Sequence, residues 1–196
     1  MKLIDTKKIV LASKSPRRKN LLEQLGLAIK IAPSNTDEDS ISIKNPEKYV
    51  KELSLLKANN TALFYPNDWV IGADTIVVVD EQILGKPRSK TDAIEMLNRL
   101  NNCEHSVFTG FSIVNLKKSC IITQSVKTTV FFKNLSPEEI QWYVNTGESF
   151  DKAGSYAIQG IGSFMVKRIS GSYSNVVGLP VCEVIEELLK LKIIQI

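Results

Sequence analysis

Residues 8–18 read KIVLASKSPRR, an apolar run followed by a polar turn and then the start of a helical pattern. Ser15 can cap the helix, and Pro16 suits its first position. Leucines at helical spacing follow, and Gly26 ends the pattern. This stretch therefore predicts a strand, a turn and a helix, which is the repeating unit of an α/β protein.

Two adjacent arginines, Arg17 and Arg18, occupy the first turn of this predicted helix. The unpaired N–H groups and the positive end of the helix dipole disfavour cations there unless an anion is held nearby. The guanidinium groups, the backbone donors and the hydroxyls of Ser13 and Ser15 would together suit a polyphosphate. The alternative is that both arginines are solvated surface charges.

Strand-like and helical segments alternate through the first half of the chain, which predicts an α/β fold whose sheet is flanked by helices. The expected strands cover residues 9–12, 28–32, 69–72 and 76–79, and the expected helices begin at Pro16, Pro46, Ser89, Ser136 and Pro180. Two long β-branched runs, 106–116 and 121–132, predict an antiparallel hairpin, so the sheet should be mixed. We find no linker-like segment and expect one domain over residues 1–196.

Composition excludes several classes of protein. With 196 residues, 43% hydrophobic and 23% charged, the chain can bury a core and is too apolar to be disordered. Residues 1–30 hold eight basic and two acidic residues, a local +6, which leaves −2 for the remainder of a chain whose total is +4. This local excess favours a small anionic ligand over nucleic acid as the partner.

Cysteine usage and hydropathy bear on location. The three cysteines are far apart and show no paired short spacing, which indicates a reducing compartment and no zinc site. No signal peptide or membrane-spanning run is visible, so we expect a cytoplasmic protein without a membrane partner.

Two acidic positions are candidates for chemistry. Asp74 interrupts the apolar runs 69–71 and 76–79, and burying a carboxylate is costly unless it is paired or metal-bound. It is our first choice for a catalytic group, and the alternative is an aspartate in a tight turn between two strands. Glu38 lies in the acidic turn TDED, residues 36–39, which offers oxygen ligands for Mg²⁺ or Mn²⁺ or forms a solvated loop.

Further polar candidates lie elsewhere in the chain. The turn at residues 85–87 would aim Lys86, and Lys57 on a predicted helix could supply another cation, although a helical lysine is usually solvated. Residues 151–160, DKAGSYAIQG, mix charge, glycine and one amide, which is typical of a ligand-contacting loop or a simple surface loop. His105 is the single histidine, so a histidine metal cluster is excluded and we expect a structural role for it.

Taken in order, these segments resemble the Maf family of nucleoside triphosphate pyrophosphatases. The matching segments are 13–18, Asp37 and Glu38, Lys57, 72–75, 85–87, 105–110, 151–160, 171–173 and 177–180. The resemblance implies hydrolysis between the α and β phosphates with a divalent metal, Mg²⁺ or Mn²⁺. It also implies a fold like that of inosine triphosphate pyrophosphatases, with two lobes around a cleft, and often a homodimer.

Within that family, residues 151–160 look like the branch that acts on dTTP and UTP, whereas the 7-methyl-GTP branch differs there. By position, the resemblance implies Asp74 as proton acceptor, with Arg17, Thr75 and Gln159 setting substrate choice. The expected substrate-binding residues are Ser13, Arg17, Arg18, Lys57, Thr75, Lys86, Lys152 and Gln159, and the expected metal ligands are Glu38 and Asp74.

The amide of Gln159 gives the base preference a physical basis. It can accept from N3–H and donate to O4 of thymine or uracil, although a flipped amide suits cytosine equally well. Thymine and uracil differ by one methyl group, worth about 1 kcal/mol, so we expect both to be accepted. The alternatives are CTP, a modified pyrimidine triphosphate or 7-methyl-GTP as substrate, or a non-catalytic nucleotide-binding regulator of cell division.

Overall fold

The computed structural model describes residues 1–3, 8–36 and 44–195. Its strands are β1 Lys2–Leu3, β2 Ile9–Leu11, β3 Ile29–Ile31, β4 Trp69–Val79, β5 Gln82–Leu84, β6 Glu104–Asn115, β7 Cys120–Phe132, β8 Val166–Ser170 and β9 Ile194–Gln195. Its α-helices are α1 Pro16–Glu23, α2 Pro46–Ala62, α3 Lys90–Leu100, α4 Pro137–Asn145, α5 Tyr173–Val177 and α6 Val181–Lys190, and its short 3₁₀ helices are η2 Ala153–Ser155 and η3 Gly160–Met165.

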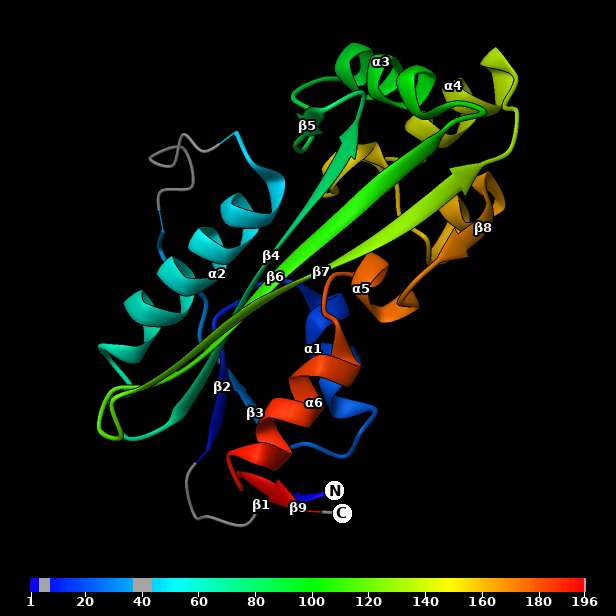
Figure 1. Ribbon diagram of the computed structural model, residues 1–196. Helices are drawn as coiled ribbons and strands as arrows, with labels where there is room; N and C mark the ends of the chain where they lie inside the picture. Colours follow the sequence, from blue (N-terminus) through cyan, green and yellow to red (C-terminus); the bar gives the residue numbers. More distant parts are fainter. Residues whose placement is uncertain (4–7, 37–43, 196) are drawn as a thin grey trace. The chain divides into compact units, whose positions relative to one another are not determined.

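Within the described residues, seven strands form one sheet in the order β3-β2-β4-β6-β7-β8, with β5 paired to β4. β2 pairs in parallel with β3 and β4, whereas the β4–β5 and β7–β8 pairs are antiparallel. β1 and β9 pair antiparallel with each other and bring the two chain ends side by side (Figure 1). The predicted mixed α/β architecture is confirmed.

Helix starts follow local sequence signals. The side chains of Ser15, Asn45 and Ser89 each accept a hydrogen bond from the backbone N–H three residues later. Ser136 and Glu139 cap each other's backbone reciprocally at the start of α4. Because such caps satisfy donors that the first turn leaves unpaired, the predicted helix starts at these positions are confirmed.

The prediction of two strands separated by a turn at residues 72–75 is wrong. β4 runs unbroken from Trp69 to Val79, so Asp74 belongs to a strand. Gly72 allows α2 to pack against this strand very closely, since a Cβ there would lie 2.3 Å from the carbonyl oxygen of Ser54. Asp74 interrupts the apolar sequence pattern, but the strand continues through it because α2 supplies a partner for its side chain.

The chain divides into two compact units. Unit 1 comprises Met1–Asp74, Thr109–Val126 and Gly178–Ile196, and unit 2 comprises Thr75–Phe108 and Lys127–Val177. The long strands β4, β6 and β7 contribute residues to both units. The unit boundaries at 74/75, 108/109 and 126/127 therefore fall inside strands, where composition offers no signal.

In unit 1, helices cover both faces of β2 and β4. Ile9 and Ile71 pack with residues of α1 and α6, whereas Val10 and Val70 pack with Ala58 and other residues of α2. Figure 1 shows α2 on one side of β2 and β4 and α6 on the other. Strands that are covered on both faces read as continuous apolar runs, which explains the sequence of residues 9–12.

Unit 2 has its own apolar core. Leu97 and Leu100 of α3, Ile140 and Val144 of α4 and Phe132 of β7 are buried in one cluster. The helices α3 and α4 pack against each other. Burial of these side chains removes apolar surface from water and stabilises the unit.

His105 lies inside this second core, as expected for a structural histidine. Its Nε2 and the hydroxyl of Tyr156 are 2.8 Å apart, and its ring packs edge-on against Phe132. Burial lowers the pKa of His105 from 6.5 to about 4, because the charged imidazolium would lose its hydration. The imidazole is therefore neutral at neutral pH.

Two further observations concern long apolar helices and the cysteines. In residues 1–3, 8–36 and 44–195, no helix is long and apolar enough to cross a membrane. Cys103, Cys120 and Cys182 all carry free thiols.

Candidate active site

Asp74 and Lys57 form a buried ion pair in unit 1. The Nζ atom of Lys57 lies 2.6 Å from Oδ1 of Asp74, and the two side chains are 10% and 9% exposed. The interpretation of Lys57 as a solvated helical lysine is wrong, because α2 turns this residue toward the sheet. Two buried charges lose their hydration, and each depends on the other for compensation.

The loop between β2 and α1 is held by Arg18. Its Nη1 donates to Oγ of Ser13 at 3.2 Å, and its Nε donates to the carbonyl oxygen of Gly178 at 2.7 Å. The side chain is half-buried, so the interpretation of Arg18 as a solvated surface charge is wrong. Arg17 lies beside it in the first turn of α1 and is also half-buried.

The register of the sheet relates this loop to the ion pair. β2 and β4 are parallel, with Leu11 opposite Ile71, and the N–H of Ala12 donates to the carbonyl of Ile71 at 2.8 Å. The chain leaves the sheet at Ser13, whereas β4 continues to Asp74. Carboxyl ends of parallel strands are the usual binding edge of α/β proteins, and here that edge carries hydroxyl, guanidinium, ammonium and carboxylate groups.

The remaining predicted site residues, Thr75, Lys86, Lys152 and Gln159, belong to unit 2. Lys86 is exposed and lines an open hollow together with Gly85, Arg88 and Asp92. The N–H of Gly154 donates to the carbonyl of Gly85 at 3.0 Å. The turn that carries Lys86 and the segment 151–160 are therefore neighbours within this unit.

The interpretation of residues 151–160 as a loop outside the core is only half right. Gly154, Ser155, Tyr156 and Ala157 are buried, and Tyr156 reaches His105 in the core. Only the two ends of the segment are accessible. Gln159 is exposed at the second end, and Thr75, at the start of unit 2, is half-buried.

Lys152 is held at the first end of that segment. Its Nζ donates to the carbonyl oxygen of Glu148 at 2.7 Å and forms an ion pair with Asp151. Its side chain is only 11% exposed. Lys152 therefore stabilises the backbone conformation before η2.

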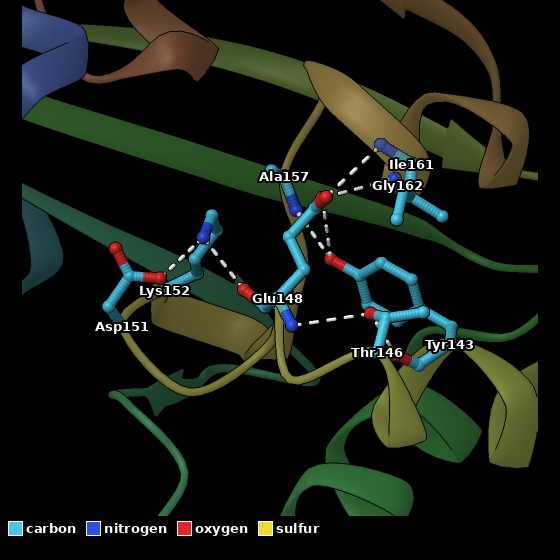
Figure 2. A network of polar contacts seen from close by, with 8 residues as sticks. All are labelled: Tyr143, Thr146, Glu148, Asp151, Lys152, Ala157, Ile161 and Gly162. Atoms are coloured by element: carbon cyan, nitrogen blue, oxygen red, sulfur yellow. Dashed lines mark hydrogen bonds and ion pairs between the residues drawn. The ribbon is translucent and has the colours of Figure 1, made fainter.

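Glu148 itself is a polar residue that the sequence patterns did not single out. Figure 2 shows its carboxylate among three donors: the N–H groups of Ile161 and Gly162, each at 3.1 Å, and the hydroxyl of Tyr143 at 3.3 Å. One acid after a helix gives no local sign of such distant partners. The carbonyl of Gly178, which holds Arg18, was missed for the same reason.

The expected metal ligands are only partly described. Glu38 lies outside the described residues, as do Asp37 and Asp39. Among residues 1–3, 8–36 and 44–195, no group of three or more His, Cys, Asp or Glu side chains could hold a metal ion. Mg²⁺ often uses one or two carboxylates and completes its coordination with water and substrate phosphates, so Asp74 fits as one such ligand.

Comparisons with known proteins agree across nearly the whole chain. A family model described as Maf-like protein matches residues 8–191. A dTTP/UTP pyrophosphatase of Syntrophus aciditrophicus is 47% identical over 183 residues, which cover 93% of this chain and 89% of that protein. Proteins of the same description from Desulfotalea psychrophila and Syntrophotalea carbinolica are 46% and 48% identical and cover 97% and 93% of this chain, and 97% and 84% of their own length.

Among solved structures, the Staphylococcus aureus Ham1 protein matches with a TM-score of 0.48 and 16% sequence identity, covering 82% of this chain and 80% of its own.

Proposed function

This chain belongs to the Maf-like protein family, and on that premise we propose that it hydrolyses dTTP and UTP to the nucleoside monophosphate and pyrophosphate. The observation that carries the proposal is an identity of 46–48% to dTTP/UTP pyrophosphatases across more than nine-tenths of the chain. The buried carboxylate at the binding edge of unit 1 supports it.

Asp74 is the proton acceptor in this proposal. Its carboxylate is paired with the ammonium group of Lys57 at 2.6 Å, and this contact fixes the position of the oxygen atoms from which a general base acts. It takes a proton from the attacking water as the oxygen of that water bonds to the α phosphorus. The bond from that phosphorus to the bridging oxygen breaks, and pyrophosphate leaves.

We assign the polyphosphate to Ser13, Arg17 and Arg18, with Lys57 and Lys86 as further cations. The contacts of Arg18 to Ser13 and Gly178 fix the plane of its guanidinium group. A fixed, permanently charged fork stabilises negative charge that builds up on phosphoryl oxygens in the transition state, because it needs no reorganisation.

We assign the base to Gln159, with Thr75 and Lys152 as supporting residues. The exposed carboxamide of Gln159 can accept from N3–H and donate to O4, the edge that thymine and uracil share. The methyl group that distinguishes these bases is worth about 1 kcal/mol, so both nucleotides should be used.

A divalent cation, Mg²⁺ or Mn²⁺, belongs to the proposal, with Asp74 and Glu38 as its protein ligands. When bound, such an ion screens the charge of the phosphates and polarises a phosphoryl oxygen.

A panel of triphosphates tests the proposal directly. The purified chain is incubated with dTTP, UTP, CTP, dGTP or 7-methyl-GTP in the presence of Mg²⁺ or Mn²⁺, and monophosphate and pyrophosphate are quantified. We expect dTTP and UTP to react at rates within about tenfold of each other and faster than the rest. Preferential cleavage of CTP or 7-methyl-GTP would contradict the assignment of substrate, and tight binding without cleavage would favour a regulator.

A further inference from the structure

The carboxylate of Glu148 caps a helical segment that it does not belong to (Figure 2). Its Oε2 accepts from the N–H of Ile161 and its Oε1 from the N–H of Gly162, both at 3.1 Å. These are the second and third residues of η3. Their N–H groups are the ones that the side chain of an N-cap residue ordinarily accepts from.

The N-cap residue of η3 is Gln159, and its side chain makes no capping hydrogen bond. Glutamine is not among the side chains preferred at this position, because the preferred caps are short. Since Glu148 accepts from the N–H groups of Ile161 and Gly162, capping of η3 does not require the carboxamide of Gln159. Gln159 is exposed at the start of η3.

The backbone on both sides of Gln159 is fixed by one network. Before it, the N–H of Ala157 donates to the hydroxyl of Tyr143 at 3.3 Å, and that hydroxyl donates to Glu148. After it, Ile161 is held by Glu148. Burial of Tyr143 and the negative charge of Glu148 raise the pKa of the hydroxyl, so it remains a protonated donor.

The approach of Glu148 to η3 depends on Gly160. This residue has a φ of +69°, and a Cβ on it would lie 3.0 Å from Oε2 of Glu148. The main chain of Glu148 is itself held, because its carbonyl accepts from Lys152 at 2.7 Å and its N–H donates to Oγ1 of Thr146 at 3.3 Å. Hydrogen bonds therefore hold both the main chain and the carboxylate of Glu148.

We propose that Glu148 is a positioning residue for base selection: it holds the start of η3 so that the carboxamide of Gln159 meets the pyrimidine edge in one orientation. This inference rests on the proposed function, because it requires that Gln159 contacts the base of the substrate. Glu148 acts through the backbone of Gln159 and does not itself touch the nucleotide.

A double-mutant cycle tests this proposal. The ratio of kcat/KM for dTTP to kcat/KM for dGTP is measured in the wild type, Glu148→Ala, Gln159→Ala and the double variant. Glu148→Ala should lower this ratio about tenfold, because two charge-assisted hydrogen bonds to η3 are lost. In the Gln159→Ala background the same change should lower the ratio by less than about twofold, since coupled residues act non-additively.

A merely structural role would give a different result. It would lower the values for dTTP and dGTP in proportion, leave their ratio unchanged, and have the same effect with or without Gln159; that outcome overturns the proposal. Glu148→Gln, which keeps one acceptor oxygen, is the second variant and should lower the ratio about threefold while disturbing the fold less. Glu95→Ala, at an exposed position on α3, is the matched control and should leave the ratio unchanged.

The two proposals fail in distinguishable ways. A wild-type chain that does not hydrolyse dTTP overturns the proposed function and this inference with it. A wild-type enzyme that prefers dTTP, together with a Glu148→Ala variant that keeps the full preference, overturns this inference alone.

Discussion

Asp74 in unit 1 and Glu148 in unit 2 are both held by hydrogen bonds, but their partners differ in kind. In unit 1, Asp74 is paired with the side chain of Lys57, whereas in unit 2, Glu148 accepts from backbone N–H groups of η3. A lysine side chain can exchange partners when a substrate arrives, but a backbone N–H cannot leave unless its segment unfolds. The first arrangement suits a group that takes part in a reaction, and the second suits a group that sets geometry.

The largest expected effect comes from Asp74→Asn, which keeps the shape of the side chain but removes its basicity. Turnover of dTTP should fall about 10²–10⁴-fold while the nucleotide still binds. Pyrophosphate release and calorimetric titration measure the two quantities. Asp80→Asn, at an exposed position just beyond β4, is the control, and near-normal turnover of Asp74→Asn would remove Asp74 from the mechanism.

The next effect concerns the lysine of the pair. Lys57→Met leaves the carboxylate of Asp74 buried without this cation, and the free energy of unfolding should fall by about 3–5 kcal/mol in chemical denaturation. Combining Lys57→Met with Asp74→Asn should restore most of the stability but no activity, because the cost arises from unpaired charge. Lys51→Met, which removes an exposed pair with Glu47 on the same helix, should change stability by less than about 1 kcal/mol. A stability of Lys57→Met equal to that of the wild type would show that the buried pair contributes nothing.

The smallest expected effect is a pH dependence of stability that arises in the core of unit 2 and not in that of unit 1. Burial lowers the pKa of His105 to about 4, so between that pH and 6.5 the unfolded chain binds a proton that the folded chain does not. The contribution of His105 to the free energy of unfolding should therefore be fully present above pH 6.5. It should decline by up to about 3 kcal/mol as the pH falls through this window. Because His105 is the single histidine, its imidazole signal can be followed directly by NMR, and His105→Phe should lack this contribution. An imidazole that titrates near 6.5 in the folded protein would contradict the expectation.

Those parts of the fold that depend on neighbouring residues could be predicted. Caps such as Ser15, Asn45 and Ser136 act within three residues of themselves, so the helix starts could be inferred from short patterns. The mixed character of the sheet followed from the hairpin-like runs that became β6 and β7. These signals are local, and tertiary packing did not override them.

The site was harder to predict where its partners are distant in sequence. Asp74 sits in a continuous strand because Lys57 reaches it from another element, and no short pattern records that contact. Glu148 finds its donors 13 and 14 residues later, at the start of a short 3₁₀ helix that has no amphipathic period. The chemistry of the candidate residues could be inferred from their types, but their burial and pairing depend on which elements pack together.

The three-part construction of unit 1 has a consequence for biosynthesis. Its apolar core takes Leu179, Val184 and Leu188 from residues 178–196, whereas the residues of unit 2 end at Val177. A ribosome releases residues in order, so α6 emerges after β2 and β4. The apolar face of these strands therefore stays exposed until α6 has been synthesised. We therefore expect a chain truncated before α6 to expose that face and aggregate.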